Sequence, residues 1–310
     1  MNILHLKYAV EVEKTGSITQ AAERLFMSQP NLSKAIRELE TTLGISLFKR
    51  SSKGIVTTQK GKEFLTYAKN ILAQIEEMEE LYQPDRQNIQ RFSISVPRGS
   101  YIAHAFTCFV NKLDPAKSID INFSETNSME TINKVMEGEC NLGIIRYQTA
   151  HEKYFFSVLD DKGMVHKPVL EYTYLALMSK SHPLAAKPIL DYYELNKYIE
   201  IMHGDLTVPF LPVSEIKKTE QSEHSKNRIY VYERGSQFDL LRKVIKTYMW
   251  VSPMPKELLE CYGLVQKKCD ASNHKYKDLL IFPADYRLST LDKAFITELY
   301  RIKNEISATK

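Results

Sequence analysis

The chain has 310 residues, 43% of them hydrophobic and 10% aromatic, so it is long enough for two or three domains and too apolar for wholesale disorder. Its net charge of +4 permits a nucleic-acid partner without requiring one. The four cysteines form no C-x-x-C pair and no zinc-type cluster, and neither a secretory signal nor an apolar run of about 18 residues occurs. We therefore expect a cytoplasmic protein without metal, cofactor or membrane partner.

The first 26 residues predict two short helices. The first ends at Gly16, a natural position for a glycine just beyond a helix. Thr19 is the expected cap of the second, which covers residues 20–26. Leu25 and Phe26 are expected to form its apolar face.

The third predicted helix has two chemically different faces. Pro30 suits its first turn, Ser28 or Gln29 is the expected cap, and the helix ends near Gly44. The apolar residues follow the spacing of one buried stripe: Leu32, Ala35, Ile36 and Leu39.

The other face of this helix is polar and comprises Ser28, Gln29, Pro30, Asn31, Ser33, Lys34 and Arg37. Two helices joined by a short turn are typical of a helix-turn-helix, whose second helix enters the DNA major groove. There, Gln and Asn can pair with adenine and Arg with guanine. A face that is merely solvated is the alternative, because this pattern alone is a weak signal.

A basic hairpin is predicted next. Lys49, Arg50 and Lys53 precede a turn at Gly54 and a β-prone return over 55–58. Beside a recognition helix, such a hairpin is a wing that can hold phosphates. Residues 1–58 contain eight Lys and Arg against five Asp and Glu, so most of the positive charge lies here.

A long helix is predicted from Gly61 to the region of Pro84, with one narrow apolar seam. The seam residues alternate at spacings of four and three: Phe64, Ala68, Ile71, Ile75, Met78 and Tyr82. This spacing favours pairing with the same helix of a second copy, which would also set the distance between two DNA half-sites. Packing on its own chain is the alternative.

The order and spacing of these motifs resemble the LysR-type transcriptional regulators. The resemblance rests on Leu4, Gly16–Ser17, Ala21–Leu25, "SQPNLSKAIRELE", Leu43–Gly44, "LFKR", Thr58 and Gly61. Ala9, Asn31 and Thr57 depart from the family pattern without removing it. The family implies a winged helix-turn-helix, a dimerising linker helix and a two-lobed effector domain like the periplasmic binding proteins. The expected domains are 1–58, 59–84 and 85–310.

From Arg91 onwards, strands alternate with helices. The ranges 92–96, 118–125 and 141–147 are predicted strands, with helices over 101–113 and 129–139 between them. This order predicts a parallel sheet with right-handed crossovers. Further strands are expected within 171–179, 198–202, 228–233, 249–253 and 279–283, and helices within 237–247 and 291–306.

The resemblance continues at lower specificity and implies two lobes joined by crossing strands near 161–168 and 264–270. "EGECNLGII", "SHPLA" and "YGLV" have counterparts in the family, with Asn141 in place of an aspartate. Lobe I is expected at about 90–160 and 271–300, and lobe II at about 165–265. The polar stretch 205–228 has no clear assignment.

Ligands of open α/β sheets bind at the carboxyl ends of strands and at helix N-termini. This rule selects Pro97, Arg98, Gly99, Ser100, Tyr101, Thr126, Asn127, Ser128, Arg146, Met202, His203, Arg234 and Gly235. Several of these are cationic, so we expect a small anionic effector, a carboxylate or a phosphate-bearing metabolite. Arginines that face solvent or form ion pairs between the lobes are the alternative.

The residues and the resemblance together predict a sequence-specific DNA-binding transcriptional regulator controlled by a small-molecule effector. The expected partners are double-stranded DNA, the effector and a second copy in a dimer or tetramer, with RNA polymerase as a further candidate. One alternative is a redox-responsive regulator that uses Cys261 and Cys269, since Lys267 and Lys268 could lower a thiol pKa. An enzyme is the other, but no P-loop, GxSxG or HExxH motif occurs.

Overall fold

The structure is a computed structural model of the chain, and it describes residues 2–51, 54–82, 89–204, 227–232, 234–270 and 275–308. These form two compact units, an N-terminal unit built on residues 1–89 and a larger C-terminal unit that begins at Gln90. Among the described residues, no helix has the length and apolar content that crossing a membrane requires.

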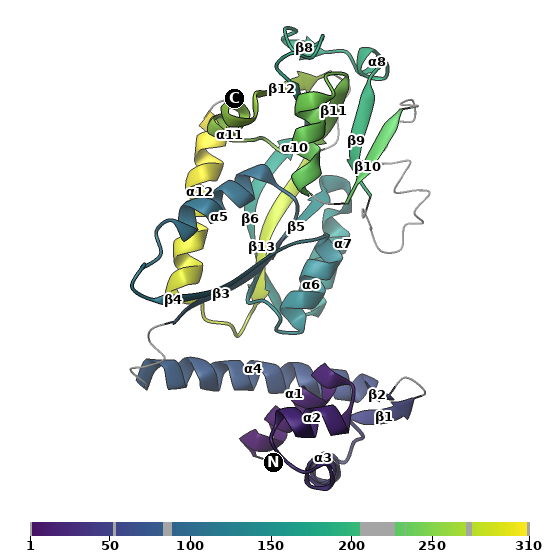
Figure 1. Cartoon of the computed structure of the whole chain (residues 1–310), viewed down its shortest axis with the longest axis vertical. Coiled ribbons are helices and arrows are strands. Elements are labelled where there is room, and N and C mark those ends of the chain that lie inside the picture. Colours follow the sequence, from purple (N-terminus) through teal and green to yellow (C-terminus); the bar gives the residue numbers. More distant parts are fainter. Residues whose placement is uncertain are drawn as a thin grey trace. The chain divides into compact units, whose positions relative to one another are not determined.

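The N-terminal unit combines short helices, a hairpin and one long helix (Figure 1). Its elements are α1 (Ile3–Thr15), α2 (Ile18–Arg24), α3 (Gln29–Leu43), β1 (Phe48–Ser51), β2 (Gly54–Thr57) and α4 (Gln59–Tyr82). Gly16 and Gly44 follow α1 and α3 at φ angles of 61° and 66°, as expected for helix-ending glycines. Ser17 caps α2 by accepting a hydrogen bond from the Gln20 amide, so the prediction of Thr19 as cap is wrong. The helix begins at Ile18, and Thr19 is already inside it.

The core of the N-terminal unit joins all four helices. It contains Ala9 and Val12 of α1, Ala21 and Ala22 of α2, Leu32, Ile36 and Leu39 of α3, and Leu65 of α4. Ala35 is only half-buried. Leu25 packs on this core as predicted, but Phe26 is 98% exposed. Phe26 lies beyond the end of α2 at φ 52°, in the turn before α3, so it is not part of a helix face.

Backbone contacts hold the hairpin to the helices. The Ile55 amide donates to the Gly16 carbonyl at 2.9 Å, and a Cβ on Gly54 would lie 2.8 Å from the same oxygen. Glu40 of α3 accepts hydrogen bonds from the amides of Leu47 and Phe48 at 2.6 and 3.1 Å through one carboxylate oxygen. Helix α3 and the first strand of the hairpin are therefore joined directly.

The first sheet of the C-terminal unit has the strand order β4-β3-β5-β13-β6. The strands are β3 (Ile89–Val96), β4 (Ser118–Glu125), β5 (Leu142–Gln148), β6 (Met164–Thr173) and β13 (Lys275–Pro283). The predicted parallel pairing holds for β3 and β5, while β13 runs antiparallel to both its neighbours. Helices α5 (Ser100–Val110) and α12 (Thr290–Ala308) cover one face, and α6 (Ser128–Met136) and α7 (Glu152–Asp161) lie on the other (Figure 1).

The second sheet has the order β10-β9-β11-β7-β12-β8. Its strands are β7 (Leu175–Ser179), β8 (Ile189–Leu190), β9 (Ile199–His203), β10 (Arg228–Val231), β11 (Thr247–Val251) and β12 (Leu264–Cys269). The helices around it are α8 (Tyr192–Leu195), α10 (Arg234–Lys243) and α11 (Lys256–Tyr262). We call the first sheet with its helices lobe I and the second lobe II.

The chain crosses between the lobes at positions that differ from the predicted ones. All of β6 pairs with β13 in the first sheet, so the first crossing is at Tyr174 and not near 161–168. The range 171–179, predicted as a single strand, contains the end of β6 and the whole of β7. The sequence is β-prone throughout this range, so the break between the two strands cannot be recognised from it. The second crossing follows β12, after Cys269, and the predicted segment 264–270 is a strand of lobe II.

Candidate nucleic-acid interface and ligand crevice

The polar face of α3 is exposed. Six of the seven predicted contact residues are open to solvent and Ser33 is half-buried; the six are Ser28, Gln29, Pro30, Asn31, Lys34 and Arg37. The Lys34 ammonium lies 3.8 Å from a Glu38 carboxylate oxygen, an exposed pair that contributes little to stability. The start of α3 thus presents hydrogen-bonding side chains outward, while Leu32, Ile36 and Leu39 hold the helix in the core.

The hairpin forms as predicted, with Lys49 opposite Val56 and Arg50 opposite Ile55. Lys49 is exposed. The side chain of Arg50 and the whole of Lys53 lie outside the described residues, so their phosphate contacts stay predictions.

The seam of α4 divides into two parts. Phe64 packs on the core of the N-terminal unit and Ala68 is buried, so its first part follows the alternative of packing within one chain. Farther along, Ile71 and Met78 are 40% and 54% exposed. Tyr67, which is not among the predicted seam residues, is 71% exposed and lies one turn before Ile71. Ile75 is half-buried, and the side chain of Tyr82 is not described.

Five of the predicted effector residues meet at one crevice between the lobes: Arg98, Ser100, Arg146, His203 and Arg234. They line a cavity of about 50 Å³. The sequence analysis missed Tyr174, Gln237, Met249, Trp250, Val251 and Ser252, which complete its wall. Gln237 could have been found, because it follows Arg234 by one helical turn on α10.

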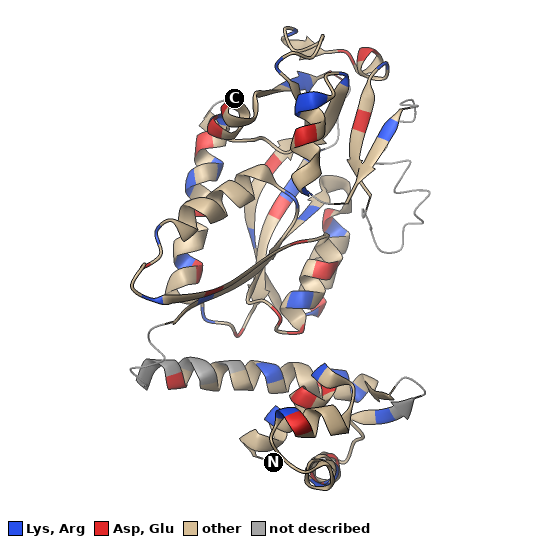
Figure 2. Ribbon diagram, in the orientation of Figure 1, with Lys and Arg blue, Asp and Glu red and all other residues tan. Residues whose placement is uncertain are grey.

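Arg146 is committed to an ion pair inside lobe I. Its guanidinium donates to both carboxylate oxygens of Asp278 at 2.8 Å and to the Arg98 carbonyl at 2.9 Å. Burial alone would lower the pKa of Arg146, but the charge of Asp278 outweighs it and holds that pKa above its ordinary value. Figure 2 shows charged residues of both signs on strands of this sheet. Arg146 therefore shapes the crevice with its charge already neutralised.

Two other arginines connect the lobes. Arg234 of lobe II forms an ion pair with Glu125 of lobe I and donates to the Ser100 hydroxyl at 3.1 Å. Arg98 of lobe I donates to the Tyr232 carbonyl of lobe II at 2.9 Å. We call Arg98, Glu125, Tyr232 and Arg234 the interlobe latch. At Arg234, the structure thus contains an ion pair between the lobes, which was the alternative to an effector-binding arginine.

Several predicted effector residues have other roles. Tyr101 is fully buried and donates to Asp278 at 2.5 Å; burial, and then the charge of Asp278, raise the pKa of its phenol well above the usual value. A Cβ on Gly99 would lie 2.9 Å from the Arg146 guanidinium, so that side chain takes the space expected for a ligand. The Ser128 hydroxyl bonds to the backbone of Arg146.

The remaining predicted residues lie outside the lining of the crevice. The Asn127 side chain accepts from the Glu130 amide, and the Thr126 amide donates to the Val96 carbonyl. Pro97 and Met202 are buried, whereas Gly235 is exposed. A role for these residues in binding an effector stays a prediction.

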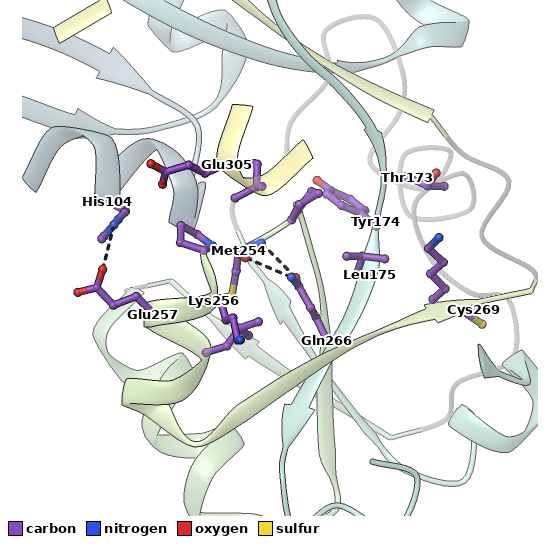
Figure 3. A pocket seen from close by; sticks show the side chains of 15 residues that line it. His104, Thr173, Tyr174, Leu175, Met254, Lys256, Glu257, Gln266, Cys269 and Glu305 are labelled. Atoms are coloured by element: carbon purple, nitrogen blue, oxygen red, sulfur yellow. Dashed lines mark hydrogen bonds and ion pairs between the residues drawn. The ribbon is translucent and has the colours of Figure 1, made fainter. Parts of the chain in front are cut away.

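A second, wider cavity of about 760 Å³ also contacts both lobes (Figure 3). His104 of α5 lies 3.6 Å from the Glu257 carboxylate of α11 at one side of it. The Gln266 amide exchanges two hydrogen bonds with the backbone of Met254. His104, Glu257 and Gln266 thus already have partners within the chain.

The redox alternative finds no support in the thiol geometry. None of the four cysteines, all of them within the described residues, forms a disulfide; Cys261 is exposed on α11 and Cys269 is half-buried at the end of β12. The Cys269 sulfur lies 3.8 Å from an Asp270 carboxylate oxygen. Among the described residues, no His, Cys, Asp and Glu cluster could hold a metal ion.

Comparison with known proteins identifies related sequences. The family model for bacterial regulatory helix-turn-helix proteins of the lysR family matches residues 3–62. The uncharacterized HTH-type transcriptional regulator YnfL of Escherichia coli K12 is 28% identical over 202 residues, 64% of each chain. The chain spans slightly under two thirds of the length of the curated relatives it matches first.

Solved structures share the fold. ArgP from Mycobacterium tuberculosis superposes with a TM-score of 0.61 at 17% identity, covering 96% of each chain. CbnR complexed with its target DNA gives a TM-score of 0.55 at 16% identity, covering 97% of this chain and 100% of that one. The predicted fold class, a winged helix-turn-helix with a long linker helix and two α/β lobes, is confirmed.

Proposed function

We propose that the chain, whose residues 3–62 match the family model for bacterial regulatory helix-turn-helix proteins of the lysR family, is a transcriptional regulator that binds double-stranded DNA through its N-terminal unit. The exposed polar start of α3 carries this proposal. Gln29, Asn31, Ser33 and Arg37 would contact bases, and the cations Lys34, Lys49, Arg50 and Lys53 would contact phosphates. The family consists of regulators, not enzymes, as the sequence analysis expected.

Selection of binding sites from random DNA tests this division of roles. Gln29→Ala should change the preferred base at one position of the selected site, because the amide would read a base edge. Lys49→Ala should weaken binding to every sequence and reduce the slope of affinity against salt by about one ion. Equal effects of the two variants on site preference and salt slope would contradict the assignment.

We further propose that the exposed part of α4 pairs two copies of the chain. Tyr67, Ile71 and Met78 expose apolar surface on this helix. Paired helices would place two copies of α3 on successive half-sites of one DNA duplex. Sedimentation equilibrium should show a weaker dimer for Met78→Glu than for Lys62→Glu, which alters the charge at another exposed position of α4. A dimer that both variants leave intact would place the interface elsewhere.

The crevice between the lobes is the proposed effector site, and a small anion is the proposed effector. Arg98 and Arg234 support this, since they approach the crevice from opposite lobes. A ligand that binds both would change the lobe geometry and with it the spacing of the DNA-binding units. Tight binding of only neutral or cationic compounds, unaffected by Arg98→Ala and Arg234→Ala, would rule this out. Contact with RNA polymerase stays a prediction.

A further inference from the structure

The interlobe latch pairs one of the chain's own carboxylates with a guanidinium that lines the crevice. Glu125 is the last residue of β4 in lobe I, and its carboxylate contacts the Arg234 guanidinium of lobe II. Both side chains are 19% exposed, so the pair is largely removed from water. An ion pair in this position resembles the contact that a small organic acid would make with the same guanidinium.

The latch contacts lie at the smaller of the two described cavities between the lobes. Arg234 holds Glu125 and Ser100 of lobe I, and Arg98 holds the Tyr232 carbonyl of lobe II. With these contacts in place the crevice retains about 50 Å³, less than the several hundred Å³ of an ordinary ligand site. In this structure the Arg234 guanidinium is therefore already paired with a carboxylate of the chain.

The side-chain oxygen of Gln237 is a polar atom of the crevice without a partner among the described residues. Gln237 is only 4% exposed and lines the cavity. A buried acceptor without a donor is costly and therefore rare in folded proteins, so such a group is informative. Gln237 and Arg234 lie one turn apart on α10, where their side chains are neighbours.

From this arrangement we propose that Glu125 is an internal substitute for the effector's carboxylate. The effector is then a small carboxylic acid with a hydroxyl or amino group near its carboxylate. Its carboxylate replaces Glu125 on Arg234, and its donor binds the side-chain oxygen of Gln237. This inference rests on the effector site proposed above and adds both the chemical class and the internal competitor.

An internal competitor reduces the apparent affinity by the fraction of molecules that are unlatched. Glu125→Gln removes the charge of the competitor, so small acids should bind this variant about tenfold more tightly or better. Trp250 is the only tryptophan of the chain and lines the crevice, so its fluorescence reports occupancy. Glu130→Gln, which removes an exposed acid of lobe I outside the crevice, is the matched control.

The probes are two pairs of acids that differ by one hydroxyl: glycolate with acetate, and lactate with propionate. For Glu125→Gln, the hydroxy acid of each pair should bind more tightly than its partner. Adding Gln237→Leu should abolish this preference, and adding Arg234→Met should abolish binding of all four. His104→Gln, in the wider cavity, should change neither result.

Three outcomes would overturn the inference. They are failure of all four acids to bind Glu125→Gln, equal affinities for Glu125→Gln and Glu130→Gln, and a hydroxyl preference that persists in Gln237→Leu. Thermal unfolding of each variant identifies misfolding, and Glu125→Ala replaces Glu125→Gln if that variant unfolds early. DNA binding of the unaltered chain is measured separately, so failure of the regulator proposal would appear there and not in the acid titrations.

Discussion

The two units handle polar side chains in opposite ways. In the N-terminal unit, the functional candidates of α3 face solvent, and contacts of the backbone and Glu40 hold the fold. In the C-terminal unit, two of the crevice arginines, Arg146 and Arg234, meet carboxylates of the chain itself, Asp278 and Glu125. We expect that exposed candidates can be altered with little loss of stability, whereas inward candidates cannot. The proposed surface for a large partner is thus left open, and the proposed site for a small ligand is held by internal contacts.

The largest expected effect concerns the buried pair of Arg146 and Asp278. Asp278→Asn should lower the free energy of unfolding by about 3–5 kcal/mol, because it leaves the buried guanidinium without a countercharge. Denaturant unfolding followed by Trp250 fluorescence measures this loss in the C-terminal unit. The double variant Arg146→Met with Asp278→Leu should lose less free energy of unfolding than either single variant, Asp278→Asn or Arg146→Met. A double variant that is the least stable of the three would show that the pair itself provides the stability.

The next effect is a pH dependence that arises from a buried histidine. His182 is 3% exposed, and burial lowers its pKa from 6.5 to about 4. The unfolded chain therefore binds a proton between these values that the folded chain does not, so stability is complete above pH 6.5 and falls as the pH drops towards 4. The loss should reach about 3 kcal/mol.

His182→Asn is the variant that isolates this effect. Its side-chain oxygen can accept the bond that the Leu184 amide now donates to the His182 ring at 3.1 Å. Unfolding of the full chain between pH 4 and 7 should become flatter in this variant. An unchanged pH profile would mean that the acid sensitivity belongs to other groups and would weaken the contrast between the units.

A smaller effect is expected where α3 meets the hairpin. Glu40→Ala leaves the Leu47 and Phe48 amides without their acceptor and should cost about 1–3 kcal/mol. In the Glu40→Ala variant, hydrogen exchange at the Leu47 and Phe48 amides should also be faster. Glu38→Ala, an exposed change on the same helix, should alter neither quantity. Equal exchange in both variants would show that the hairpin is held without Glu40.

The smallest expected effect on stability is at the exposed face itself. Arg37→Ala should change the free energy of unfolding by less than about 0.5 kcal/mol, because the side chain is exposed. Its selected DNA site should nevertheless change, if the guanidinium reads a guanine. A large loss of stability would show that Arg37 supports the fold and would remove the clearest difference between the two units.

The sequence predicted the N-terminal unit more completely than the crevice, for a physical reason. Gly16, Pro30 and Gly44 act on residues next to them, so helix ends can be read locally. Phe26 was misjudged because a left-handed turn, and not helix periodicity, sets its direction. The partners Arg146 and Asp278 are 132 residues apart, and only strand pairing brings them together. Glu125 lies one residue before Thr126, where the predicted site begins, and a predicted anionic effector favours cations over carboxylates.

The contacts of the Glu40 carboxylate bear on how much a bound DNA duplex would have to deform. Since this carboxylate joins α3 to the first strand of the hairpin, it restrains the distance between the helix proposed to read bases and the strand proposed to bind phosphates. The duplex must then supply the adjustment, by changing its groove width or bending between the two contacts. Base pairs that the protein never touches would influence affinity through their stiffness, with flexible pyrimidine–purine steps favoured there.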